Sequence, residues 1–242
     1  MIRRDFISSL AAAATTCNKL KIPSRRPAPA GLLGFDMSIY VGPGQWIVAK
    51  QDTGASFAFI ECAHGTEAGS HFAKHWTDSR DAGLVRGAYQ RLTSSAPGRE
   101  QAYTFARAFL GQGVSLEGDD LPPAVDVEFE TCGPELVDAQ RFTQELRDWV
   151  AVIETEFRRC PILYTSSGFW HNFVRGSEDF AYMPLWVTSS QRPPQIPKPW
   201  IRYRFWQYST EQHIRGFTQT VDLDVFQGTI DELTHLIKQS RI

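Results

Sequence analysis

From residue 32 onward, short apolar segments alternate with longer segments of helical spacing, and this alternation constrains the fold more than any other feature. Strand and helix patterns that alternate along a chain favour a parallel sheet with helices packed against it. Eight segments have the length and the apolar content of buried strands. They are residues 32–38, 57–66, 84–92, 121–130, 160–167, 184–190, 203–209 and 221–226. Eight strands are enough to close a barrel.

Helical spacing separates the early strands but fades after the fifth. The pattern predicts helices over 71–82, 99–110 and 136–157, and a last helix over 230–239. Between the fifth and eighth strands, the connections are rich in Pro, Gly and polar residues instead. We therefore predict the α/β class and an irregular, TIM-like β/α barrel.

The stretch PPAVDVEFE places acidic residues where strand sterics favour Val and Ile. Alternate residues of a strand share a face, so Asp126 and Glu128 point one way while Val125 and Val127 point the other. Two carboxylates on one face repel, which favours the protonated form of one of them and suits acid catalysis. The alternative is a strand end at which the acids are simply hydrated.

The ends of other predicted strands also bear polar and aromatic residues. In a barrel of this kind the active site lies at the carboxyl ends of the strands. Residues at several strand ends would therefore converge with Asp126 and Glu128 on one mouth, which favours a functional role for the pair. These residues are Asp36, Tyr89, Tyr164, Trp186, Trp206, Gln207 and Asp222.

The first thirty residues differ from the rest of the chain. MIRRDFISSLAAAATTC has a basic start and a short run of small apolar residues, which is typical of an export signal, and Arg3–Arg4 resembles a twin-arginine signal. Cys17 as a lipoprotein site is a weaker alternative. Residues 19–30 are Pro-rich and basic, so we expect residues 1–30 to be signal and linker, and 31–242 to be one catalytic barrel. No apolar run reaches the length of a membrane span.

Charge and motif content exclude several other classes. The chain has 242 residues and a formal net charge of -2, so there is no general excess of basic residues for nucleic acid binding. The four cysteines and six histidines show no metal-binding spacing, and we expect neither metal nor cofactor. We also expect a monomer.

Six segments together resemble the lysozymes of glycoside hydrolase family 25: GFDMSIYVG, DVE, ILYTSSGFW, PLWV, FWQYS and VDLDVF, in that order. The resemblance implies a barrel of five β/α units followed by three strands, and N-acetylmuramidase activity on bacterial peptidoglycan. It implies that Glu128 is the general acid and that Asp126, Asp36 and Asp222 complete the acidic cluster. Substrate-binding residues would be Tyr164, Trp206, Gln207, Tyr89 and Trp186.

Two segments depart from the family pattern. Where the family has Lys-Ala-x-Glu-Gly, this chain has Glu61-Cys62-Ala63-His64-Gly65, and Thr188-Ser189-Ser190 follows PLWV. Two other functions remain as alternatives, namely a chitinase-like barrel glycosidase and a non-catalytic saccharide-binding barrel. The resemblance favours a retaining reaction, with either the substrate acetamido group or an aspartate as nucleophile.

Overall fold

A closed ring of eight strands forms the centre of the computed structural model, which describes residues 26–111, 116, 118–129 and 138–242. β1 pairs with β2 on one side and with β9 on the other, and this closes the barrel. A further two-residue strand, β3 (Glu67–Ala68), pairs with the end of β2. The barrel strands are β1 (Leu32–Met37), β2 (Phe57–His64), β4 (Val85–Arg91), β5 (Ala124–Val127), β6 (Ile162–Ser166), β7 (Leu185–Thr188), β8 (Phe205–Gln212) and β9 (Val221–Phe226).

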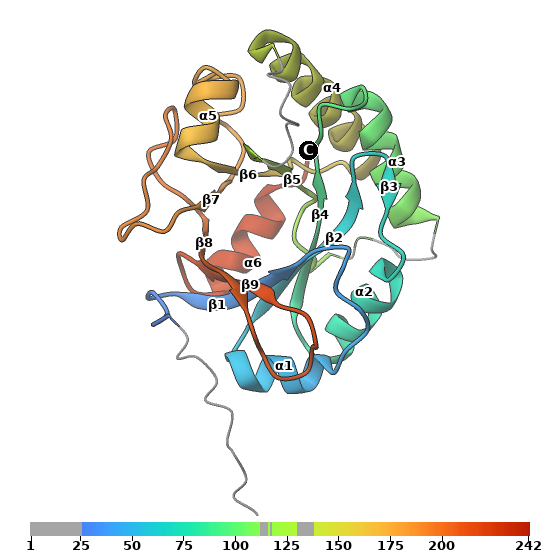
Figure 1. Ribbon diagram of the computed structural model, residues 1–242, viewed down its shortest axis with the longest axis vertical. Helices are drawn as coiled ribbons and strands as arrows, with labels where there is room; N and C mark the ends of the chain where they lie inside the picture. The colour runs from blue at the N-terminus through green and yellow to red at the C-terminus, as the bar shows by residue number, and fades with distance from the viewer. Residues whose placement is uncertain (1–25, 112–115, 117, 130–137) are drawn as a thin grey trace, which may run out of the picture.

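Helices follow the first five barrel strands and surround them (Figure 1). No helix separates β7, β8 and β9 within the described chain. The prediction of five β/α units followed by three strands is therefore confirmed. The helices are α1 (Trp46–Thr53), α2 (Phe72–Asp81), α3 (Gly98–Leu110), α4 (Ala139–Phe157) and α5 (Ser167–Phe173), and α6 (Ile230–Gln239) follows β9.

The structure corrects three expectations about the elements. The spacing did not predict α1 or α5, because α1 buries only Trp46 and Ala49 and α5 is a short run dominated by aromatic residues. The strand expected over 121–130 forms only over Ala124–Val127, after two prolines that cannot donate to the ladder. β9 runs antiparallel to both of its neighbours, although the alternating pattern predicted a parallel sheet.

The barrel interior is filled by aromatic rings at one end and is polar at the other. Phe57, Phe59, Phe205 and Phe226 are fully buried and form one cluster with the apolar face of α6. That helix lies behind the ring of strands in Figure 1 and covers the end of the barrel opposite the cavity described below. A Cβ at Gly34 would lie 2.4 Å from the Phe57 ring, so only glycine leaves space for that ring.

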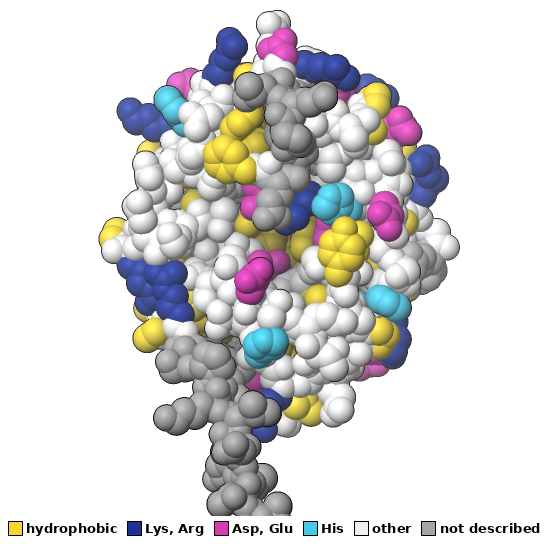
Figure 2. All heavy atoms as spheres, in the orientation of Figure 1, with side chains coloured by type: hydrophobic (Ala, Val, Ile, Leu, Met, Phe, Trp, Pro, Cys, Tyr) yellow, Lys and Arg dark blue, Asp and Glu magenta, His cyan; other side chains and the backbone are white. Residues whose placement is uncertain are grey.

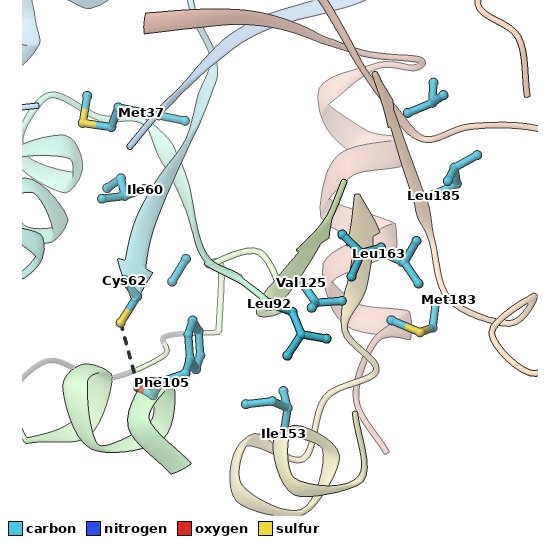
Figure 3. Close-up of a cluster of buried hydrophobic side chains, with 14 of the residues drawn as sticks. Met37, Ile60, Cys62, Leu92, Phe105, Val125, Ile153, Leu163, Met183 and Leu185 are labelled. Atoms are coloured by element: carbon cyan, nitrogen blue, oxygen red, sulfur yellow. Dashed lines mark hydrogen bonds between the residues drawn. The ribbon is translucent and has the colours of Figure 1, made fainter. Parts of the chain in front are cut away.

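A second apolar layer lies between the strands and the outer helices. Outward-facing strand residues such as Ile60, Val125 and Leu163 belong to this layer (Figure 3). The Cys62 thiol lies there, 3.9 Å from the carbonyl oxygen of Phe105 on α3. Cys62 and Cys160 are free thiols, while Cys132 lies outside the described residues. Among the described helices, none combines the length and the hydropathy needed to cross a bilayer.

Candidate active site

A cavity of about 460 Å³ opens at the end of the barrel where β5 and β6 finish. Acidic, basic and hydrophobic side chains gather around the centre of the face drawn in Figure 2. Inward-facing residues of the strands line the cavity, together with the loop after β1. The lining includes Asp36, Ser38, Tyr40, Tyr89, Arg91, Asp126, Glu128, Tyr164, Trp186, Thr188, Gln207, Glu211 and Asp222.

Asp126 and Glu128 point into this cavity, as their spacing predicted, and both contact Arg91 from the neighbouring strand. The guanidinium Nε donates to Asp126 Oδ2 over 2.8 Å, and Nη2 donates to Glu128 Oε1 over 2.5 Å. Asp126 Oδ1 is buried and has no hydrogen-bond partner among the described residues. Burial raises the pKa of Asp126, the charge of Glu128 raises it further, and Arg91 opposes both effects.

The Gln207 side chain connects the two walls of the cavity. Its amide nitrogen donates to Asp36 Oδ2 over 2.9 Å and to Asp222 Oδ2 over 3.1 Å. Its oxygen accepts from the hydroxyls of Tyr164 and Thr188, both at 2.9 Å. All the hydrogen-bonding capacity of the amide is therefore used, and its orientation is set by its partners.

Asp222 and Asp224 reach the cavity region because β9 is antiparallel. Its amino end therefore lies beside the carboxyl ends of the parallel strands, with Asp222 in the lining and Asp224 fully buried. Asp224 accepts from Trp186 Nε1 over 2.8 Å and is hydrogen-bonded to Asp36. Burial raises the pKa of both Asp36 and Asp224, and we expect the two carboxyls to share a proton.

Three predicted aromatic residues form one wall of the cavity. Trp186 stacks on Phe59 with ring centroids 4.1 Å apart, and the Tyr164 ring lies 4.8 Å from it at a steep angle. Tyr89 donates from its hydroxyl to the Met37 carbonyl over 3.2 Å. Burial raises the pKa of both tyrosines, so their hydroxyls stay protonated.

Trp206 does not line the cavity. Adjacent strand residues face opposite sides, so Trp206 faces outward where its neighbour Gln207 faces inward. It is 3% exposed, belongs to the outer apolar layer, and donates from Nε1 to the Ser189 carbonyl over 2.9 Å. This corrects the expectation that Trp206 contacts a saccharide.

The residues that sequence reasoning missed are Arg91, Thr188 and Tyr40. Arg91 shares a face with Tyr89, two residues earlier, so the strand period could have predicted its position. Tyr40 is 70% exposed at the rim, in the loop after β1. No local pattern identifies it, because the position of a loop residue depends on what the loop packs against.

The departure at Glu61 and His64 helps to hold the loop after β1. Glu61 is buried, and its Oε2 accepts from the backbone N–H of Ile39 over 2.9 Å. Its Oε1 lies 3.3 Å from His64 Nδ1. The pair therefore supports the rim on which Tyr40 lies, without lining the cavity itself.

Paired carboxyls, a tyrosine and a glutamine lie together at the open end of this barrel. This arrangement is typical of β/α-barrel glycoside hydrolases. A model of the family "Glycosyl hydrolases family 25" matches residues 35–217. The chain belongs to this family.

Curated proteins and solved structures agree with that placement. Lysozyme M1 of Streptomyces globisporus is 30% identical over 216 residues, which cover 86% of this chain and 71% of that protein. The uncharacterized protein YegX of Escherichia coli K12 is 31% identical over 216 residues, which cover 86% and 74% respectively. The bacterial lysozyme from Streptomyces coelicolor superimposes with a TM-score of 0.77 at 25% identity, covering 88% of this chain and all of that one. A muramidase from Acremonium alcalophilum gives a TM-score of 0.74 at 26% identity, covering 86% and 99%.

Proposed function

We propose that this protein is a muramidase that hydrolyses the β-1,4 bond between N-acetylmuramic acid and N-acetylglucosamine in bacterial peptidoglycan, with Glu128 as general acid. Family membership and relatives named as lysozymes and muramidases support the reaction class. The cavity supports the chemistry, because glycoside hydrolysis needs a proton donor and carboxylates that stabilise an oxocarbenium-like centre.

The observation that supports this role most directly is the hydrogen-bond chain from Gln207 through Tyr164 to Glu128. The Tyr164 hydroxyl donates to the Gln207 oxygen over 2.9 Å. The same hydroxyl lies 3.3 Å from Glu128 Oε2 and donates toward it, so it positions this carboxyl at the cavity wall. Glu128 Oε1 accepts from Arg91 at the same time. Two donors therefore hold the Glu128 carboxyl at the cavity wall, where it can deliver a proton to a glycosidic oxygen.

Asp126 supports a retaining route that uses the substrate acetamido group. Its buried Oδ1 lacks a partner among the described residues and lies beside Glu128 in the cavity wall. A substrate acetamido N–H would satisfy this oxygen and turn the acetamido carbonyl toward C1. Glu128 then protonates the leaving oxygen as that carbonyl attacks, and the glycosidic bond breaks. Water next adds at C1 and gives a proton back to Glu128, while Asp36 and Asp222 stabilise positive charge.

The decisive experiment digests purified peptidoglycan with the wild type and with Glu128→Gln. We expect new reducing ends at muramic acid, β-configured product in the first NMR spectra, and a loss of about 10²–10⁴ in turnover for the variant. Reducing ends at glucosamine would favour the chitinase-like alternative. Binding without any new ends would favour the non-catalytic alternative. A variant within a few-fold of the wild type, with unchanged melting, removes Glu128 from the role.

The substrate also supports the assignment of residues 1–30 as an export signal and linker, because peptidoglycan lies outside the cytoplasmic membrane. Residues 1–25 are outside the described chain, but Arg26 donates to the carbonyls of Tyr208 and Ser190, so the end of the predicted linker contacts the barrel.

A further inference from the structure

Arg91 is the single basic side chain among the described residues that line the cavity, where it faces five carboxylates. It contacts both Asp126 and Glu128, through different nitrogens and over 2.8 and 2.5 Å. Its side chain is 21% exposed, while those of Asp126 and Glu128 are 4% and 19% exposed. One guanidinium thus serves two carboxyls in a largely buried site.

The pairing of strands determines this arrangement. Arg91 is the register partner of Asp126 in the parallel β4–β5 pair and of His64 in the β2–β4 pair. Since both Arg91 and Asp126 face inward at the same level, the guanidinium meets the carboxylate directly and reaches Glu128 two residues further on. The geometry is a fixed fork rather than a mobile surface contact.

Charge balance in this group depends on one proton. If both carboxyls were ionised, the group with Arg91 would have one net negative charge in a site that disfavours it. With one proton shared by the two carboxyls, the charge of Arg91 balances the remaining carboxylate and the group is neutral. Burial opposes the charge of Arg91, but Asp126 and Glu128 outweigh it and raise the pKa of the guanidinium, so it stays charged.

We propose that Arg91 is a positioning residue that sets the proton count of the Asp126–Glu128 pair, so that the pair holds the single proton used in catalysis. This inference rests on the proposed function, since it concerns the proton that the reaction consumes. Arg91 acts through the two carboxyls rather than on the substrate. Its role predicts a change in pH dependence rather than a change in substrate affinity.

Other titratable groups around the pair also contribute to its pH dependence, but Arg91 is the cation in direct contact with both carboxyls. The groups that face it from neighbouring elements are Asp36, Glu61, His64, Tyr89, Tyr164, Glu211, Asp222 and Asp224.

The test compares the pH profiles of kcat and kcat/KM on soluble peptidoglycan strands for the wild type, Arg91→Gln and Arg91→Lys. Removing a cation in contact with acids favours their protonated forms, so both limbs of the Arg91→Gln profile should move to higher pH by about 1–3 units. Arg91→Lys keeps the charge, so its limbs should stay near those of the wild type while kcat falls. Arg147→Gln, which removes an exposed arginine paired with Asp179, is the matched control and should move neither limb.

Two outcomes overturn the proposal. A rise in KM with unmoved limbs would make Arg91 a substrate-binding residue. A loss of kcat and kcat/KM by the same factor at every pH, with unmoved limbs, would make the role of Arg91 merely structural. If Arg91→Gln does not fold, carboxyl ¹³C NMR of the wild type decides: near neutral pH the Asp126–Glu128 pair should hold one proton, and two ionised carboxyls there overturn the proposal. A wild type that releases no reducing ends refutes the proposed function instead, and the NMR titration still tests the proton count of the pair.

Discussion

The shared proton between Asp36 and Asp224 makes the stability of the fold depend on pH. Burial raises the pKa of both carboxyls in the folded protein, whereas unfolded aspartates lose their protons near pH 4. Above that pH the folded state binds more protons than the unfolded state. The free energy of unfolding therefore falls as pH rises, by about 1.4 kcal/mol per pH unit for each extra proton retained.

Asp224→Asn should remove the shared proton without changing the shape of the side chain. The Asn oxygen can still accept from Trp186 Nε1, and its N–H can donate to an ionised Asp36 in place of the shared proton. The pH slope of stability should then decrease by one proton. Between pH 5 and pH 7 the variant should gain up to about 3 kcal/mol relative to the wild type, which is two pH units of that slope.

Denaturant unfolding at a series of pH values between 5 and 7 measures this difference. Asp119→Asn, at an exposed carboxylate, is the control and should leave the slope unchanged. Parallel stability curves for the wild type and Asp224→Asn would refute the shared proton. A variant that is less stable by the same amount at every pH would show that Asp224 matters through packing alone.

Two further predictions concern Tyr164 and the amino terminus. Tyr164→Phe removes the hydroxyl that connects Glu128 with Gln207. It should lower kcat/KM about 10- to 100-fold, in line with the loss of a hydrogen bond to an ionisable group. Unchanged kinetics would contradict a role for this hydrogen-bond chain in catalysis. Replacing Arg3 and Arg4 together with Lys should retain the precursor in the cytoplasm, as fractionation would show. Normal export of the double variant would argue against the twin-arginine route.

The sequence by itself determined the features that depend on neighbouring residues. The alternation of strand and helix predicted the barrel, because each segment's periodicity reports which face it buries. The spacing of Asp126 and Glu128 predicted that both face one side, since side chains of a strand alternate. The same rule, applied to Trp206 and Gln207, would have separated the outward ring from the inward amide.

Tertiary structure alone decided which distant residues meet. Gln207 donates to Asp36 across 171 residues of chain, and Arg91 reaches Asp126 across 35. Asp222 lies at the mouth because β9 runs antiparallel, a direction that its own residues do not specify. Whether Glu128 holds a proton follows from these contacts. Proton affinity in a buried site depends on every charge and donor nearby and not on the order of residues along the chain.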